Sequence, residues 1–254
     1  MPAALALSPH LDDAAFSCGG TLALLAQAGW RVTMATLFTG SVADPKGFAL
    51  ACQTDKGLGP EVDYMALRRD EDRDAARALG IAPPCHMPFR EAPHRGYASA
   101  PELFAEVRPN DGIVPDLTRA LHTLIAETAP DLILAPQAVG GHVDHVQAVR
   151  ALMDLAPAIP ILWWRDFPYT VRDAAPREPL RERFADLPTQ IVAFGARAQA
   201  SKHEACAAYA SQLGFQFGGA DNLAAQLARE GGVERFRRSG ALPDDLARLL
   251  DDAG

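Results

Sequence analysis

The chain has 254 residues, of which 48% are hydrophobic and 22% charged; this composition is typical of a folded globular domain and argues against a disordered chain. The formal net charge of -8 disfavours a nucleic acid as partner, because binding to phosphates depends on Lys and Arg. Four scattered cysteines without a C-x-x-C pair predict reduced thiols in a cytoplasmic protein, and no apolar run reaches the roughly 20 residues of a membrane span.

Short apolar runs alternate with longer amphipathic segments from the start of the chain. The run 3–7 predicts a strand, a helix follows from about Asp13 to Ala28, and Gly29 closes that helix. A second strand begins at Arg31. This strand–helix–strand order predicts a parallel sheet.

The same alternation continues through the rest of the chain, and we expect one domain over residues 1–254. Helices are predicted over 66–80, 112–130, the stretch after Gly141, and 196–213. Strands are predicted over 131–136, 160–165 and 189–194. Three long stretches fit neither class, and we expect them to be connections around a binding site: 39–63, 88–112 and 166–188.

The segment SPHLDD places His10, Asp12 and Asp13 where the first strand ends and the first helix begins. Ligands of open parallel sheets bind in the crevice beyond the carboxyl ends of the strands. For the aspartates alone, a helix cap and a favourable charge at the positive end of the helix are the better explanation. This segment therefore needs a second cluster before it indicates a site.

The segment GGHVDHVQAVRA, residues 140–151, supplies that second cluster. It also follows a buried strand and opens a helix, and His142 and His145 are three residues apart, so that they can share one side of it. Two polar clusters at the carboxyl ends of two parallel strands predict one common site.

Two adjacent carboxylates in a crevice indicate a bound cation. Unit charges about 4 Å apart repel by roughly 4 kcal/mol in a partly buried site, so Asp12 beside Asp13 needs a counter-charge. Three ligands of mixed His and carboxylate type with an open position for water are typical of catalytic zinc. Such an ion activates water and leaves one carboxylate free to move protons.

A different enzyme class uses similar residues. His10, Asp12 and His145 also fit the two-His, one-carboxylate site of a non-haem iron oxygenase. That interpretation leaves Asp13 and His142 without a role, and the predicted parallel sheet disfavours a barrel-like scaffold.

The motifs resemble those of the LmbE-like family of metal-dependent deacetylases, which includes the PIG-L type N-acetylglucosaminyl deacetylases. The resemblance is carried by PHLDD, HVDH, RRDEDRDAARALG and KHEACAAYASQ, and together they span roughly residues 3–213. It implies a Rossmann-like three-layer α/β sandwich with a mostly parallel sheet. The implied activity is removal of an acetyl group from an N-acetylated sugar.

By position, the resemblance implies that His10, Asp13 and His145 ligate the metal, which is Zn²⁺ with Fe²⁺ as the alternative. One departure, Leu11 where the family usually has proline, removes no ligand.

The resemblance also implies roles around the metal. Asp12 is the general base, His142 stabilises the oxyanion, and Asp144 orients a histidine, which we expect to be His142. Arg68 matches a position that grips the sugar.

Several points stay open from the sequence. A non-catalytic sugar-binding relative is the alternative to an enzyme, although such a protein has no need of a spare base. The loop 88–97 offers Arg90, His94, Arg95 and Tyr97 to a substrate pocket. Neither the group attached to the sugar nor the choice between a monomer and a homo-oligomer is decided.

Overall fold

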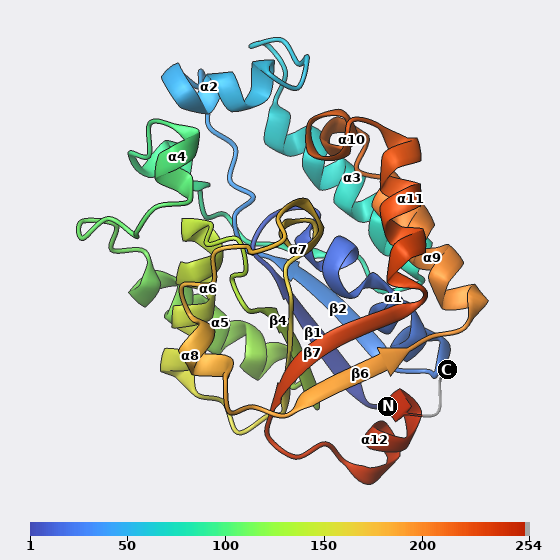
Figure 1. The fold of residues 1–254 in the computed structure, drawn as a ribbon. Helices are drawn as coiled ribbons and strands as arrows, with labels where there is room; N and C mark the ends of the chain where they lie inside the picture. Colours follow the sequence, from blue (N-terminus) through green and yellow to red (C-terminus); the bar gives the residue numbers. More distant parts are fainter. Residues whose placement is uncertain (252–254) are drawn as a thin grey trace.

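The computed structural model describes residues 1–251, and in it seven strands form one sheet in the order β3–β2–β1–β4–β5–β7–β6 (Figure 1). The strands are β1 Ala3–Ser8, β2 Arg31–Thr36, β3 Cys85–His86, β4 Leu132–Pro136, β5 Ile161–Trp164, β6 Thr189–Ala193 and β7 Val233–Ser239. Strand β7 pairs antiparallel with β5 and β6, and all other neighbouring pairs are parallel. The prediction of an α/β fold with a mostly parallel sheet is therefore confirmed.

Helices cover both faces of this sheet and its upper end. They are α1 Asp13–Gln27, α2 Gly47–Thr54, α3 Tyr64–Leu79, η1 Ala92–Arg95 (a 3-10 helix), α4 Ala100–Leu103, α5 Val114–Thr128, α6 Val143–Leu155, α7 Tyr169–Arg172, α8 Arg181–Phe184, α9 Ala196–Ala207, α10 Ala210–Phe217, α11 Ala220–Glu230 and α12 Asp244–Asp251. In Figure 1, α5 and α6 lie on one side of the sheet and α1, α3 and α9 on the other.

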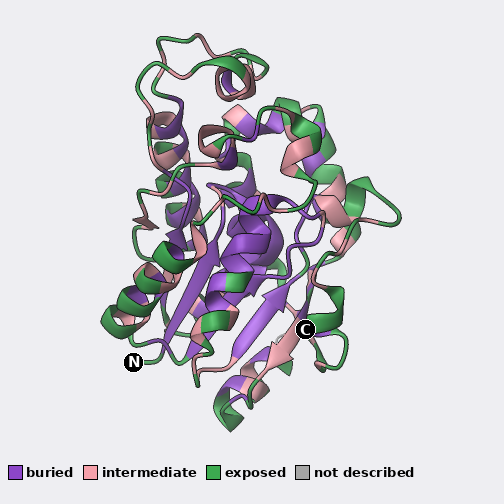
Figure 2. Ribbon diagram, turned by 90° about the vertical axis from the view of Figure 1, so that its left-hand side faces the viewer, coloured by how far each residue is buried: buried purple, intermediate pink, exposed green. Residues whose placement is uncertain are grey.

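The core is divided by the sheet into two apolar layers. Along β1, Leu5 and Leu7 pack in the layer of α5 and α6, whereas Ala4 and Ala6 pack in the layer of α1. This alternation follows from the two-residue period of a strand, and both faces are apolar because helices cover both. Figure 2 shows the resulting buried interior.

The strand order creates a switch point between β1 and β4. The chain builds outward from β1 through β2 to β3, and then returns to the other side of β1 with β4 and β5. Connections on the two sides leave in opposite directions, so the carboxyl ends of β1 and β4 face a crevice. Both histidine-containing segments follow these two strands.

Three details differ from the sequence-based expectations. The helix expected over 196–213 is two helices, α9 and α10, and Tyr209 between them is buried with its hydroxyl donating to Asp72 Oδ1 at 2.6 Å. The stretches expected to be loops carry the short helices α2, α4, α7 and α8. The antiparallel strand β7 was not predicted, because its residues Val233–Ser239 are mostly charged.

Within residues 1–251, none of the helices is both long and apolar enough to cross a membrane.

Candidate metal centre

The turn after β1 is held by a short network of hydrogen bonds. Ser8 Oγ donates to the His10 carbonyl at 2.6 Å and accepts from the Ala14 N–H at 3.0 Å. The N–H of His10 donates to Asp13 Oδ2 at 2.7 Å. These bonds fix His10 and Asp13 relative to each other before any ligand is bound.

Asp12 occupies a strained position in this turn. Its φ of 147° and ψ of -33° lie in a region that favours glycine, and such strain costs about 1–3 kcal/mol. Arg68 Nη2 donates to the carbonyl of Leu11 at 2.9 Å and so holds the peptide that precedes Asp12. Strain of this kind persists only where surrounding contacts enforce it, and it is concentrated at functional sites.

His142, at the start of α6, is held in one protonation state by its surroundings. His142 is the N-cap residue, and its Nδ1 accepts from the Asp144 N–H at 3.2 Å. Burial, together with the nearby His10, lowers the pKa of His142 well below its ordinary value. His142 is therefore neutral with its proton on Nε2, which makes Nε2 a hydrogen-bond donor.

Three potential ligand atoms form a small triangle. Asp13 Oδ2 lies 3.3 Å from His10 Nδ1 and 3.1 Å from His145 Nε2, and these two nitrogens are 3.2 Å apart. Tetrahedral ligands with bonds of about 2.0–2.1 Å to zinc are separated by about 3.3 Å, so the triangle fits one ion. One ring nitrogen from each of His10, His142 and His145 also lies within 4.8 Å of the other two.

Each of the two histidines of this triangle, His10 and His145, has a carboxylate next to its other ring nitrogen. Asp144 Oδ2 lies 3.0 Å from His10 Nε2, and Asp166 Oδ1 lies 2.6 Å from His145 Nδ1. A carboxylate in this place fixes the proton on the outer nitrogen and turns the lone pair of the other nitrogen toward a metal. The expected pairing of Asp144 with His142 was wrong: the Asp144 carboxylate contacts His10, and only its backbone N–H reaches His142.

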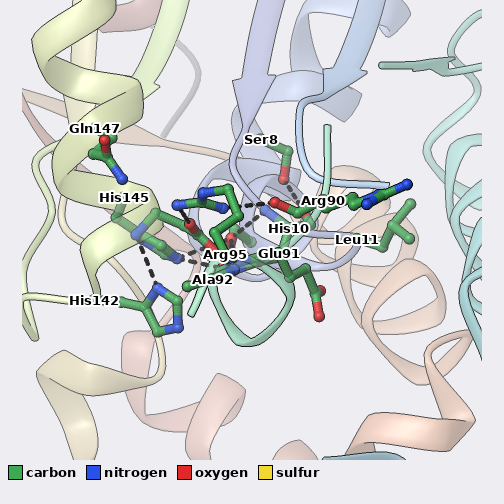
Figure 3. Close-up of polar contacts among 12 residues, drawn as sticks. Ser8, His10, Leu11, Arg90, Glu91, Ala92, Arg95, His142, His145 and Gln147 are labelled. Carbon is green, nitrogen blue, oxygen red and sulfur yellow. Dashed lines mark hydrogen bonds and ion pairs between the residues drawn. The ribbon is translucent and has the colours of Figure 1, made fainter. Parts of the chain in front are cut away.

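Asp144 is itself held from the loop that contains η1. Its Oδ1 accepts a hydrogen bond from Arg95 Nη2 at 2.7 Å, and its Oδ2 accepts one from the Ala92 N–H at 3.0 Å. Figure 3 shows Arg95 and Ala92 beside His10. Arg95 therefore supports a histidine, and it does not line the cavity described below. Because Asp144 is buried, these partners are needed to keep it as an anion.

Sequence reasoning missed Asp166, although a signal for it was present. Asp166 follows β5 in the segment WWRDF, at the carboxyl end of the strand next to β4. Strand β5 is thus the third strand of the sheet that is followed by a buried carboxylate or histidine near the crevice.

The adjacent carboxylates Asp12 and Asp13 have opposite electrostatic environments. Burial and the charge of Asp13 raise the pKa of Asp12 to about 7. Burial also acts to raise the pKa of Asp13, but His145 and His10 outweigh it and lower that pKa well below its ordinary value. Paired carboxylates whose pKa values are driven apart have different chemical roles.

A cavity of about 290 Å³ opens beside these residues. Its walls include His10, Asp12, Asp13 and His142 together with side chains of α2, α3, α4, α7 and α10. From the loop 88–97 it receives Glu91 and Pro93, and not the four residues that we expected.

Arg68 lines this cavity but is largely engaged by the protein. Its side chain is 5% exposed, Nη1 lies 2.6 Å from Glu91 Oε1, and Nη2 contacts the Leu11 carbonyl. Within the described part of the chain, Nε is a buried donor without a partner.

The chain matches a family model and several characterised proteins. The model, PIG-L, described as GlcNAc-PI de-N-acetylase, matches residues 5–156. A 2'-N-acetylparomamine deacetylase of Streptomyces fradiae is 35% identical over 182 residues, which are 70% of this chain and 62% of that protein. A 1D-myo-inositol 2-acetamido-2-deoxy-alpha-D-glucopyranoside deacetylase of Nakamurella multipartita is 29% identical over 198 residues, 73% of this chain and 64% of that protein. The matches thus span less than two thirds of these two relatives.

Solved structures match over nearly the whole chain. The zinc inhibited form of teicoplanin deacetylase Orf2 has a TM-score of 0.76 at 27% identity and covers 96% of this chain and 99% of its own. The A40926 pseudoaglycone deacetylase Dbv21 has a TM-score of 0.77 at 29% identity, with 95% and 98% covered.

Proposed function

This chain belongs to the PIG-L family, and from that premise we propose that it is a metal-dependent deacetylase of N-acetylated sugars. The observation that carries the proposal is the triangle of His10, Asp13 and His145 at the switch point of the sheet, with a second carboxylate, Asp12, beside it. The names of the matched relatives agree, because all four described above are deacetylases.

His10, Asp13 and His145 are the residues that would hold the ion. His10 Nε2 contacts Asp144 and His145 Nδ1 contacts Asp166. The other ring nitrogens, His10 Nδ1 and His145 Nε2, therefore present lone pairs to the same point as Asp13 Oδ2. His142 is excluded from this set because its Nε2 carries a proton. We propose Zn²⁺ as the ion, with Fe²⁺ as the alternative that the same donors accept.

The ion, when bound, would make a water molecule nucleophilic and polarise the acetamide carbonyl. Asp12 takes a proton from that water as its oxygen adds to the acetyl carbon. His142 Nε2–H donates to the oxygen of the tetrahedral intermediate. The C–N bond then breaks, Asp12 returns the proton to the departing nitrogen, and acetate and a free amine result.

The proposed substrate is an N-acetylglucosamine-type sugar that carries a further group. The two curated relatives are named for N-acetylated amino sugars, which supports this class. Arg68 lines the cavity, and we propose that its guanidinium contacts the sugar.

A direct test measures acetate release from N-acetylated sugars by metal-stripped protein and by protein reloaded with Zn²⁺ or Fe²⁺. We expect activity only after reloading, and equal rates with and without oxygen. Oxygen consumption in step with turnover would instead indicate the iron oxygenase alternative. A reloaded protein that binds the sugars without releasing acetate would indicate a non-catalytic relative.

A further inference from the structure

Gln216 joins the centre from a distant part of the chain. Its Nε2 donates to Asp12 Oδ2 at 2.7 Å across a sequence separation of 204 residues. Gln216 lies in α10, outside the residues 5–156 that match the family model. Helix α10 is near α7 above the sheet in Figure 1, and Arg172 of α7 donates to the Gln216 carbonyl.

The contact acts on a carboxylate whose orientation matters. Asp12 is 2% exposed, its backbone is strained, and Arg68 Nη2 lies 3.7 Å from the same oxygen, Oδ2. Gln216 and Arg68 thus both approach Oδ2, which restrains the carboxylate and leaves Oδ1 as the oxygen that they do not contact. A fixed carboxylate holds its proton-accepting oxygen in one place, and small misplacements of reacting groups cost large factors in rate.

Within residues 1–251, the other end of the Gln216 amide has no hydrogen-bond partner. Oε1 is buried and unpaired among the described residues, and Gln216 lines the catalytic cavity. A buried acceptor without a partner is unfavourable, so a ligand whose donor reaches Oε1 on entering the cavity gains affinity from it. An N-acetyl sugar carries such donors in its amide N–H and its hydroxyls.

We propose that Gln216 is a positioning residue for Asp12 and that its Oε1 accepts a hydrogen bond from the bound N-acetyl sugar. The inference rests on the proposed function, in which Asp12 moves the proton. One amide side chain then links the substrate to the base: its nitrogen orients the carboxylate, and its oxygen reads an N–H or O–H group of the sugar.

The test compares Q216M and D12A singly and combined, in the metal-loaded enzyme with N-acetylglucosamine conjugates. We expect Q216M to lower kcat by about 10- to 100-fold and to raise KM several-fold, with metal content unchanged. In the D12A background we expect Q216M to have little further effect on kcat, because the group that it positions is gone. An unchanged kcat in Q216M, or an equal loss in both backgrounds, would overturn the role through Asp12, and an unchanged KM would overturn the role of Oε1.

Two further variants keep the result interpretable. Q216N retains an amide that is too short to reach Asp12, so it should lose kcat as Q216M does even if the Met side chain disturbs packing. Q226M removes a half-buried glutamine of α11 whose Oε1 is likewise buried and without a partner in the described part of the chain. Gln226 does not line the cavity, so Q226M should keep wild-type kcat and KM. Near-normal turnover of D12A alone would refute Asp12 as base, a failure of the proposed function and not of the Gln216 contact.

Discussion

Asp166 links two neighbouring strand ends through one side chain: Oδ1 accepts from His145 Nδ1 at 2.6 Å and Oδ2 accepts from the Val139 N–H at 2.9 Å. The residue therefore fixes both the ring of His145 and the turn that leads to its helix. We predict that D166A lowers the affinity for the metal by about 10- to 100-fold, as is usual when a partner behind a metal-binding histidine is lost. Competition with a chelator of known affinity measures the change.

The matched control is D186A, which removes an exposed aspartate of the same long connection. Its metal affinity should equal that of the wild type. An unaltered affinity in D166A would show that Asp166 serves only the backbone turn.

Asp13 and His142 are expected to separate metal binding from catalysis. D13A removes one corner of the triangle of ligand atoms, so we predict protein that retains little metal after dialysis. H142A leaves the triangle intact but removes the Nε2–H donor, so we predict wild-type metal content and a kcat lower by about 100- to 1000-fold, as for loss of an oxyanion donor. Elemental analysis and acetate release on the same samples decide the matter. Loss of metal in H142A with retention in D13A would identify His142 as the third ligand.

The sequence indicated the two ends of this site but not what holds them in place. His10, Asp13 and His145 follow apolar runs that end in polar clusters, and that local pattern is visible without a fold. The partner of Asp144 was misassigned because spacing along one helix shows only neighbours such as His142. His10 lies 134 residues away, and the strand order brings it to Asp144.

Residues of the later chain were harder to predict for a related reason. Gln216 and Glu234 lie in segments without a recognisable motif, and each acts on the N-terminal segment across more than 200 residues. Strand β7 reads Val-Glu-Arg-Phe-Arg-Arg-Ser, in which the buried positions Glu234 and Phe236 alternate with charge. A buried glutamate interrupts the apolar pattern by which a strand is recognised in a sequence. Glu234 is buried because it accepts hydrogen bonds from two backbone N–H groups of α1.

Gly20 is required where α1 passes the end of β6. A Cβ atom at this position would lie 2.2 Å from Cζ of the Phe194 ring, with two more ring atoms within 2.6 Å. We predict that G20A lowers the free energy of unfolding by about 1–3 kcal/mol, because the buried ring must move to make room. Urea unfolding measures the change. In G19A the nearest atom to the new Cβ would be Lys202 Cγ at 3.3 Å, a far milder approach than that to the Phe194 ring, so a smaller effect is expected there. Equal effects would contradict a role for Phe194.

Lys202 is a buried cation between two glutamates. Its Nζ lies 2.8 Å from Glu230 Oε2 and 2.9 Å from Glu234 Oε1, and Glu234 also accepts from the N–H groups of Gly20 and Thr21. We predict that K202M destabilises the protein by about 3–5 kcal/mol, because it leaves a buried carboxylate without its cation. The exposed Lys46, replaced in K46M, is the control and should change stability little.

The pH dependence of that difference provides a further check on the pair. Burial alone would lower the pKa of Lys202, but Glu234 and Glu230 outweigh burial and raise it above its ordinary value. A raised pKa in the folded state stabilises fully below the pKa of the unfolded lysine, about 10.4, and the benefit is lost as the pH rises beyond it. The stability difference between wild type and K202M should therefore be constant from about pH 7 to 9 and should shrink above about pH 10.4. Urea unfolding at each pH measures it, and a difference that already declines between pH 7 and 9 would mean that Lys202 is not held as a cation by these glutamates.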